Sequence, residues 1–259
     1  MKKIHLLLSV VVAMTIVVPA AAERIPVRQQ QLPRRGSMVA RSGNGKVVAN
    51  FEILQTVQGD EVTIQLTYHF LDGSIDEETT TYSQRGTFGL VRNHHVQKGP
   101  FFTRPVDFAV DARTSTATSI TTDSGGKVHS STEHLSLPDD VANGFIGTLL
   151  LNVPRNTPPF HVGLVTPFGG GRLVKLTISP EGEQSFLAAG QPAKATVFRI
   201  HPELGGIIGI LAKLIGIQPK DVMVWVQEGD RPAVVRIVGQ LGGYGPVLSS
   251  ELEGDSFGR

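Results

Sequence analysis

The sequence predicts a mainly β protein, with a large curved antiparallel sheet of half-barrel or barrel-like form and two short helices. Many segments rich in β-branched and aromatic residues follow one another, and the turns between them are short and contain glycine or proline. Only two stretches have the apolar spacing of a helix. Because the connections are short, an antiparallel sheet is favoured over alternating strand and helix units.

The composition indicates one folded domain. The chain has 259 residues, of which 40% are hydrophobic and 18% are charged, so it is too apolar for a disordered chain. The absence of cysteine excludes disulfides, thiolate metal sites and a catalytic cysteine. Since 24 basic residues nearly balance 23 acidic ones, we expect no nucleic-acid partner.

The ends of the chain differ in composition from its centre. Residues 1–22 contain two lysines, an apolar run and a final group of alanines, which is typical of a signal peptide cut after Ala22. We therefore expect a periplasmic or secreted protein. Residues 23–45 carry glutamines, prolines and arginines without apolar periodicity and predict a flexible arm. The single β-rich domain is expected over 46–252, followed by a C-terminal tail over 253–259.

Strand signals begin near Lys46. In the segment after Gly59, the residues Val62, Ile64 and Leu66 share one parity and polar residues take the other, as in a half-buried strand. Similar segments recur to the end of the domain, giving about a dozen strands. They are expected at 46–58, 61–71, 74–83, 87–96, 106–112, 114–122, 127–134, 160–166, 172–179, 182–188, 194–201, 221–227, 233–241 and 247–252.

Two helices are expected between these strands. Ser136, Pro138 and the pair Asp139 and Asp140 have the order of a helix start, and apolar residues follow at spacings of three and four as far as Asn152. The second helix is expected over 205–215. The longest apolar stretch after the leader is about 14 residues, whereas a membrane helix needs roughly 20. We therefore expect no transmembrane span in the mature chain.

The sequence contains no recognisable catalytic, metal-binding or cofactor-binding motif. The G-x-S-x-G pentapeptide and the HExxH pattern are absent, and no two histidines have helical spacing. The most suggestive polar group is His94, His95 and Asp107, since histidine is the usual proton shuttle near neutral pH. Adjacent histidines on a strand point to opposite faces, so His94 and His95 would share one site only where the strand is irregular.

Several strings resemble a group of uncharacterised exported bacterial proteins, and the likeness covers roughly Gly86 to Leu252. More distantly, the long antiparallel run resembles the periplasmic half-barrel proteins that carry lipids or lipoproteins, at the level of the fold alone. The resemblance implies no catalytic residues. The strings that carry it are 134–145, 149–152, 201–207, 214–216, 218–221 and 224–226.

These observations lead to a hypothesis of a non-enzymatic binder or carrier of an apolar, lipid-like molecule. A curved sheet has one apolar concave face that must be filled by a helix, a ligand or a partner. Two alternatives stay open: a hydrolase or lyase that uses His94, His95 and Asp107 in a cleft, and a structural envelope protein that pairs its strand edges with a partner protein. The candidate ligand-binding residues are Phe88, Phe101, Phe102, Phe145, Leu149, Ile207, Leu211 and Trp225.

Overall fold

The computed structural model of the chain describes the residues that make up the sheet and its core. These are residues 24–103, 105–123, 125–167, 171–203, 219–229, 231–241, 245–252 and 256–257. The predicted signal peptide, the predicted second helix with Ile207 and Leu211, and part of the predicted tail lie outside them.

Fifteen strands and one α-helix form within the described residues. The first eight strands precede the helix α1(Ile146–Leu150), and seven follow it. Before the helix lie β1(Arg34–Ser42), β2(Val47–Gln58), β3(Glu61–Phe70), β4(Ile75–Ser83), β5(Gly89–Lys98), β6(Val106–Asp111), β7(Thr116–Thr122) and β8(Val128–His134). After it lie β9(Phe160–Thr166), β10(Arg172–Ala188), β11(Gln191–Glu203), β12(Val222–Gln227), β13(Ala233–Gln240), β14(Val247–Leu252) and β15(Ser256–Phe257).

All the strands belong to one antiparallel sheet, as the sequence predicts. The order is β15-β10-β11-β12-β13-β14-β1-β2-β3-β4-β5-β6-β7-β8, and β9 pairs with the first half of β10. Most neighbours are consecutive in the chain. The exceptions are β15, which pairs with β10, and β1, which pairs with β14. In the second of these pairings Met38 lies opposite Leu252, and the two halves of the sheet are joined. The sheet is open, because β8 at one end pairs with neither β9 nor β15, which both lie along β10 at the other end.

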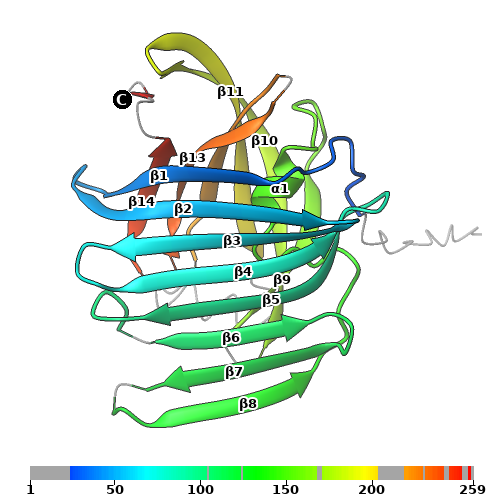
Figure 1. Ribbon diagram of the computed structural model, residues 1–259, viewed down its shortest axis with the longest axis vertical. Helices are drawn as coiled ribbons and strands as arrows, with labels where there is room; N and C mark the ends of the chain where they lie inside the picture. Colours follow the sequence, from blue (N-terminus) through cyan, green and yellow to red (C-terminus); the bar gives the residue numbers. More distant parts are fainter. Residues whose placement is uncertain are drawn as a thin grey trace, which may run out of the picture.

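The two halves of this sheet cross at a steep angle and enclose a hollow. Figure 1 shows β1 to β8 stacked as a front layer, with β10, β11 and β13 running across them behind and α1 between the layers. The main core cluster has the same arrangement: it joins Val62 and Tyr82 of the front layer to Leu149 of α1 and to Ile178 and Phe198 of the rear layer. The core therefore lies in the hollow.

The N-terminal segment is part of the fold, and the prediction of a flexible arm over 23–45 is wrong. Strand β1 pairs with both β2 and β14. The residues before it are held by glutamines: Gln84 accepts a hydrogen bond from the backbone of Gln31 at 2.7 Å, and Gln55 donates one to the carbonyl of Leu32 at 2.7 Å. Of the three glutamines that suggested a linker, Gln31 is buried and its backbone is bound by Gln84.

The helix predicted up to Asn152 is shorter than expected. Only Ile146–Leu150 is α-helical, and Asp139 and Asp140 precede an isolated parallel bridge between Val141 and Gly163 instead of starting a helix. Gly144, with a φ of +68°, separates the bridge from the helix. The positive φ is cheap for glycine and costly for other residues, so this position ends the extended segment.

Two smaller features also differ from the expected boundaries. The strands expected at 172–179 and 182–188 form one strand, β10, whose pairing with β11 shifts between Pro180 and Gly182. Ser256–Phe257, expected to lie in a tail, forms β15 against β10. No helix among the described residues has the length and apolar character that crossing a membrane requires.

Candidate functional site

The chain itself fills most of the hollow. The segment that follows Gly144 buries Phe145, Leu149 and Leu150 in the main core cluster. The ring of Phe145 stacks on Tyr82, with centroids 4.8 Å apart, and the Tyr82 hydroxyl lies 3.4 Å from Thr148 Oγ1. Burial raises the pKa of Tyr82 to about 12, although the bond to Thr148 opposes the shift, so its phenol stays neutral. The concave face is therefore occupied by the protein's own side chains.

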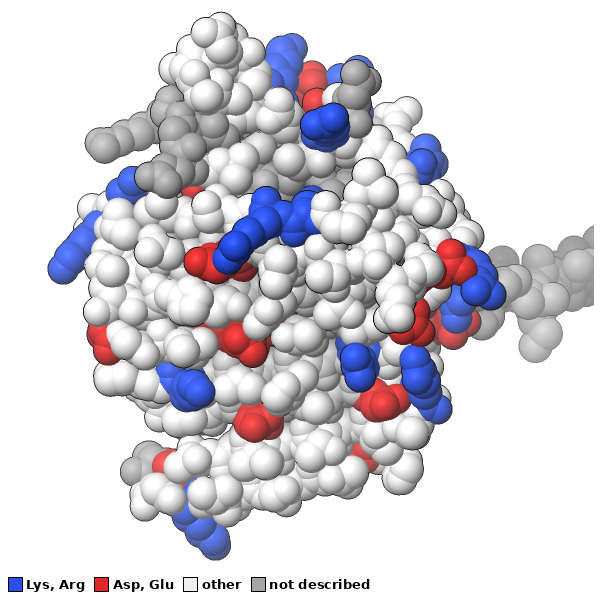
Figure 2. All heavy atoms as spheres, in the orientation of Figure 1, with Lys and Arg blue, Asp and Glu red and all other residues white. Residues whose placement is uncertain are grey.

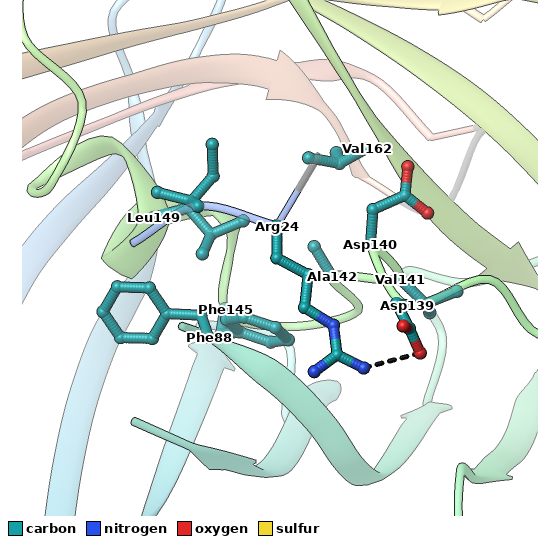
Figure 3. Close-up of a pocket in the computed structure, with 10 residues that line it drawn as sticks. Arg24, Phe88, Asp139, Asp140, Val141, Ala142, Phe145, Leu149 and Val162 are labelled. Carbon is teal, nitrogen blue, oxygen red and sulfur yellow. Dashed lines mark ion pairs between the residues drawn. The ribbon is translucent and has the colours of Figure 1, made fainter. Parts of the chain in front are cut away.

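A small void remains beside α1. Its volume is about 10 Å³, roughly the space that one water molecule needs. Figure 3 shows Phe88, Phe145 and Leu149 on one side of it and the 139–142 segment on the other. An ion pair between Arg24 and Asp139, 2.5 Å long, lies at this site. A lipid chain does not fit into a void of this size.

The predicted ligand-binding residues fall into separate clusters. Phe88, Phe145 and Leu149 meet at the void. Phe101 and Phe102 pack on Phe70 in a second cluster, with the rings of Phe70 and Phe101 4.0 Å apart.

Trp225 belongs to the opposite face of β12. Its neighbours Val224 and Val226 enter the main core, and side chains alternate along a strand. Trp225 packs instead with Phe186 and Val235, and its indole donates a 2.6 Å hydrogen bond to Gln184. The structure therefore brings three of the eight candidates together, places three elsewhere, and leaves Ile207 and Leu211 outside the described residues.

The three residues of the enzymatic alternative do not converge. His94 Nε2 lies 2.8 Å from Asp107 Oδ1, and about half of each of these side chains is exposed. His95 points to the other face of β5, where its Nε2 lies 2.9 Å from Asp76 Oδ1. The two histidines thus take opposite faces, as expected for neighbours on a regular strand, and no cleft contains all three residues.

Around His95 lies a group of buried and partly buried polar residues that no sequence motif announces. We call it the inner polar cluster: Asp76, Glu78, Asn93, His95 and Gln97. Asp76 and Glu78 share the parity of Tyr82 on β4, so they face the hollow. Gln97 donates a 2.6 Å hydrogen bond to Asp76, and Asn93 donates one of 2.8 Å to Glu78. In the sequence, the sign of this burial is that Asp76 and Glu78 alternate in step with Tyr82, an aromatic residue expected to face the core.

The inner polar cluster holds a buried ion pair. Burial alone would lower the pKa of His95, but the hydrogen bond and charge of Asp76, with a smaller contribution from Glu78, outweigh it and raise this pKa from 6.5 to about 9. Burial raises the pKa of Glu78. His95 is therefore protonated at neutral pH. A general base for that pH range needs a pKa near 7, so the pair is better suited to a structural role than to proton transfer.

The inner polar cluster is covered from the hollow by Gly144. A Cβ atom at this position would lie 1.9 Å from Thr80 Oγ1 and 3.0 Å from Asn93 Nδ2. Only glycine allows the backbone to approach the cluster this closely. The side-chain oxygen of Asn93 is buried without a hydrogen-bond partner. The cluster is thus tightly enclosed at this point.

A second cavity lies at one end of the hollow, and we call it the end pocket. Its volume is about 420 Å³, within the range of small-molecule sites. The floor includes Leu150, Phe198 and Val226, all of which belong to the main core cluster. The complete lining is Arg28, Gln29, Leu150, Leu151, Asn152, Val153, Pro154, Arg155, Asn156, Thr196, Phe198, Val226, Glu228, Gly229 and Pro232.

Polar groups surround this apolar floor. Thr196 donates a 2.7 Å hydrogen bond to Glu228, and Arg155 forms an ion pair of 3.1 Å with Glu183. Arg28 is exposed, and its guanidinium forms no ion pair with the described residues. The end pocket therefore combines an apolar floor with an available cation at its rim.

Asn152 holds the backbone of Arg28 at the rim of the end pocket. Its side-chain oxygen accepts hydrogen bonds from the backbone N–H groups of Arg28 and Gln29, at 2.9 and 2.7 Å. Its amide nitrogen donates to the carbonyl of Thr148 at 3.1 Å. Asn152 is buried, so these bonds form away from water and hold the N-terminal segment against the end of α1.

The described residues offer no group of three histidine or acidic side chains arranged to hold a metal ion. On the face shown in Figure 2, basic and acidic side chains are interspersed over the strands, without a broad area of one sign.

Comparisons with known proteins place few constraints on the chain. No family model and no curated protein matches it. Among solved structures, it is similar to a β-barrel-like protein of a domain of unknown function, DUF1849, from Brucella abortus. The identity is 8%, the TM-score is 0.46, and the match covers 89% of this chain and 99% of the other.

Proposed function

We propose that this protein is a non-enzymatic binder of a single-chain amphiphile with an anionic head group, and that the ligand occupies the end pocket. One observation carries the proposal: an apolar floor continuous with the core lies next to Arg28, whose backbone is held by Asn152 and whose guanidinium has no acidic partner among the described residues. The acyl chain would contact Leu150, Phe198 and Val226. The head group would accept charge-assisted hydrogen bonds from Arg28.

This site replaces the concave face of the sheet as the place where an apolar ligand binds. The α1 segment occupies that face, and the void of about 10 Å³ beside it is too small for a chain. The end pocket provides about 420 Å³ without displacement of core residues. We further propose that binding takes place outside the cytoplasm, following the signal peptide predicted in residues 1–22.

An enzymatic function has less support. His94 and Asp107 lie close together but on an exposed surface, and His95 is held in an ion pair on the other face. A proton-transfer site requires a base within reach of a substrate that is shielded from water. Neither pair meets both conditions.

Titration with a dansyl-labelled undecanoic acid tests the proposal. The protein should enhance the dansyl fluorescence, and palmitate should displace the probe more effectively than palmityl alcohol does, since only palmitate carries the anionic head group. Arg28→Gln should weaken palmitate binding about tenfold, the equivalent of losing one charge-assisted hydrogen bond.

Arg35→Gln is the matched control, because Arg35 lies on β1 with a largely exposed side chain and does not line the end pocket. This variant should bind palmitate like the original protein. Absence of probe binding would reject the proposed function. Equal displacement by acid and alcohol, with no effect of Arg28→Gln, would reject the role assigned to the head group.

A further inference from the structure

The outer edge of β8 is unprotected. Strand β8 pairs with β7 along its whole length without a register shift, and no proline or lysine lies within Val128–His134. Bulges, prolines and lysines are the usual means by which proteins prevent pairing at a sheet edge. No backbone hydrogen bond joins the outer side of β8 to another described residue. Six of its seven residues are exposed, and Ser131 is partly exposed.

The pairing with β7 determines which residues face outward. At the two ends of the hairpin, the N–H of Leu135 donates to Ser115 and the carbonyl of Lys127 accepts from Asp123, so odd-numbered residues of this strand bond to β7. Backbone direction alternates along an antiparallel strand. The N–H and C=O groups of Ser130 and Thr132 therefore point away from the sheet.

We propose that β8 pairs with β8 of a second copy of this chain, antiparallel and about a twofold axis at Ser131. In this register, Ser130 of one copy faces Thr132 of the other, and the outward N–H and C=O groups of both strands form hydrogen bonds. The two Ser131 residues face each other. The sheet then continues from one copy into the other.

The charges of β8 favour its own copy as the partner. In this register, His129 lies opposite Glu133 of the second copy, and the same pair forms again on the other side of the axis. A cross-strand pair of a histidine and a carboxylate is attractive when the histidine is protonated, while like charges placed opposite each other would oppose the pairing. Within its own chain, His129 Nε2 already lies 3.0 Å from Asp123 Oδ2, whereas Glu133 is exposed and forms no ion pair with the described residues. Pairing with the second copy would therefore give Glu133 the cationic partner that it lacks in its own chain.

A single introduced thiol tests the register, because the chain contains no cysteine. In Ser131→Cys, the two sulfur atoms would come from residues directly opposite in a non-hydrogen-bonded pair, with Cα atoms about 4.5 Å apart, which is within the range that a disulfide spans. In the control Val128→Cys, which keeps every charged residue of β8, the two thiols would be six residues apart along the paired strands, about 20 Å, beyond that range.

The measurement is the rate of covalent dimer formation under mild oxidation, followed on a non-reducing gel. Ser131→Cys should form the dimer at least tenfold faster than Val128→Cys. Equal rates, or a faster rate for Val128→Cys, would overturn the proposed register.

Light scattering of the unmodified protein and of two further variants tests the pairing itself. Thr132→Pro removes an outward N–H without removing a bond to β7, so it should reduce the dimer fraction, whereas Thr132→Ala should leave it unchanged. A circular dichroism spectrum establishes that each variant is folded. A folded Thr132→Pro variant that dimerises like the original protein would overturn the proposal. So would an equal loss of dimer in Thr132→Ala.

Discussion

The outer strands β8 and β9 are protected very differently. On β9, the N–H of Gly163 donates to the carbonyl of Asp140, and its carbonyl accepts from Ala142. The side chain of Asn143 continues this pairing, because its amide donates to the carbonyl of Val165 at 2.7 Å and its oxygen accepts from the N–H of Val165 at 2.9 Å. Strand β8 has no such cover among the described residues. One edge is thus closed by the chain itself, and the other is open to a partner.

A single segment, residues 140–145, both closes the β9 edge and begins to fill the hollow. Residues 140–143 pair with β9, Gly144 lies on the inner polar cluster, and Phe145 begins the apolar residues that fill the core. A change at any of these positions should therefore affect the closed edge and the core together. A change to the outward-facing backbone groups of β8 should affect association with little effect on stability.

The largest effect is expected at Gly144. In Gly144→Ala, the new Cβ would lie 1.9 Å from Thr80 Oγ1 on a backbone with a φ of +68°, so both the contact and the conformation are unfavourable. We expect a loss of at least about 4 kcal/mol in the free energy of unfolding, measured by urea denaturation.

Gly147→Ala is the matched control, since it lies three residues further along in α1. The nearest atom to its Cβ would be Val234 Cγ2 at 3.6 Å, an ordinary contact. Alanine also favours a helix over glycine, so stability should stay the same or rise by up to about 1 kcal/mol. Similar losses for both variants would show that Gly144 has no special role in closing the edge.

The second effect is a dependence of stability on pH. The pKa of His95 is raised to about 9 in the folded protein. The stabilisation of the fold by protonated His95 is therefore fully present below pH 6.5 and is lost as the pH rises through 9. We expect a fall on the order of 3 kcal/mol in the free energy of unfolding between these values. Urea midpoints at pH 6 and pH 9.5 measure it.

His95→Gln should remove most of this fall, because glutamine does not titrate. His94→Gln is the control on the neighbouring residue, whose side chain is half-exposed and lies on the other face of β5. His94→Gln should show the same fall in the free energy of unfolding between pH 6 and pH 9.5 as the original protein. A fall that is the same in His95→Gln as in the original protein would contradict the assignment of the pH dependence to the inner polar cluster.

The sequence predicts the strands well but not the inner polar cluster. The strand over Glu61–Phe70 shows its buried face through local alternation, so its position needs no knowledge of the rest of the fold. The burial of Asp76 and Glu78 depends on contacts with His95, Asn93 and Gly144, which are 15 or more residues away, so their polar character made β4 resemble a half-exposed strand.

Strand β1 shows the same limit. Its sequence contains three arginines, two serines and a glycine, and it has a weak strand signal by itself. It forms because it pairs with β2 and, through Met38 and Leu252, with a strand more than 200 residues later in the chain. The end pocket could not be predicted either, because Asn152 positions Arg28 from 124 residues away.

A smaller effect is expected at Asn143. Asn143→Ala leaves the N–H and the carbonyl of Val165 without their partners on the closed edge. Since a buried unpaired polar group costs about 1 to 3 kcal/mol, we expect a loss of about 2 kcal/mol in urea denaturation. Asn50→Ala, at an exposed position on β2, should change stability by less than about 0.5 kcal/mol. Equal effects at the two positions would contradict the closed-edge role of Asn143.

The smallest effect on stability is expected on the open edge. Thr132→Pro should change the free energy of unfolding by less than about 1 kcal/mol, because the N–H that it removes points away from β7. Ser131→Pro, one residue earlier, removes an N–H that bonds to β7 and should cost about 2 to 3 kcal/mol. Urea denaturation at a protein concentration too low for association separates the two. If Thr132→Pro were as destabilising as Ser131→Pro, then the outer side of β8 would be held by the protein itself, and both edges of the sheet would be closed.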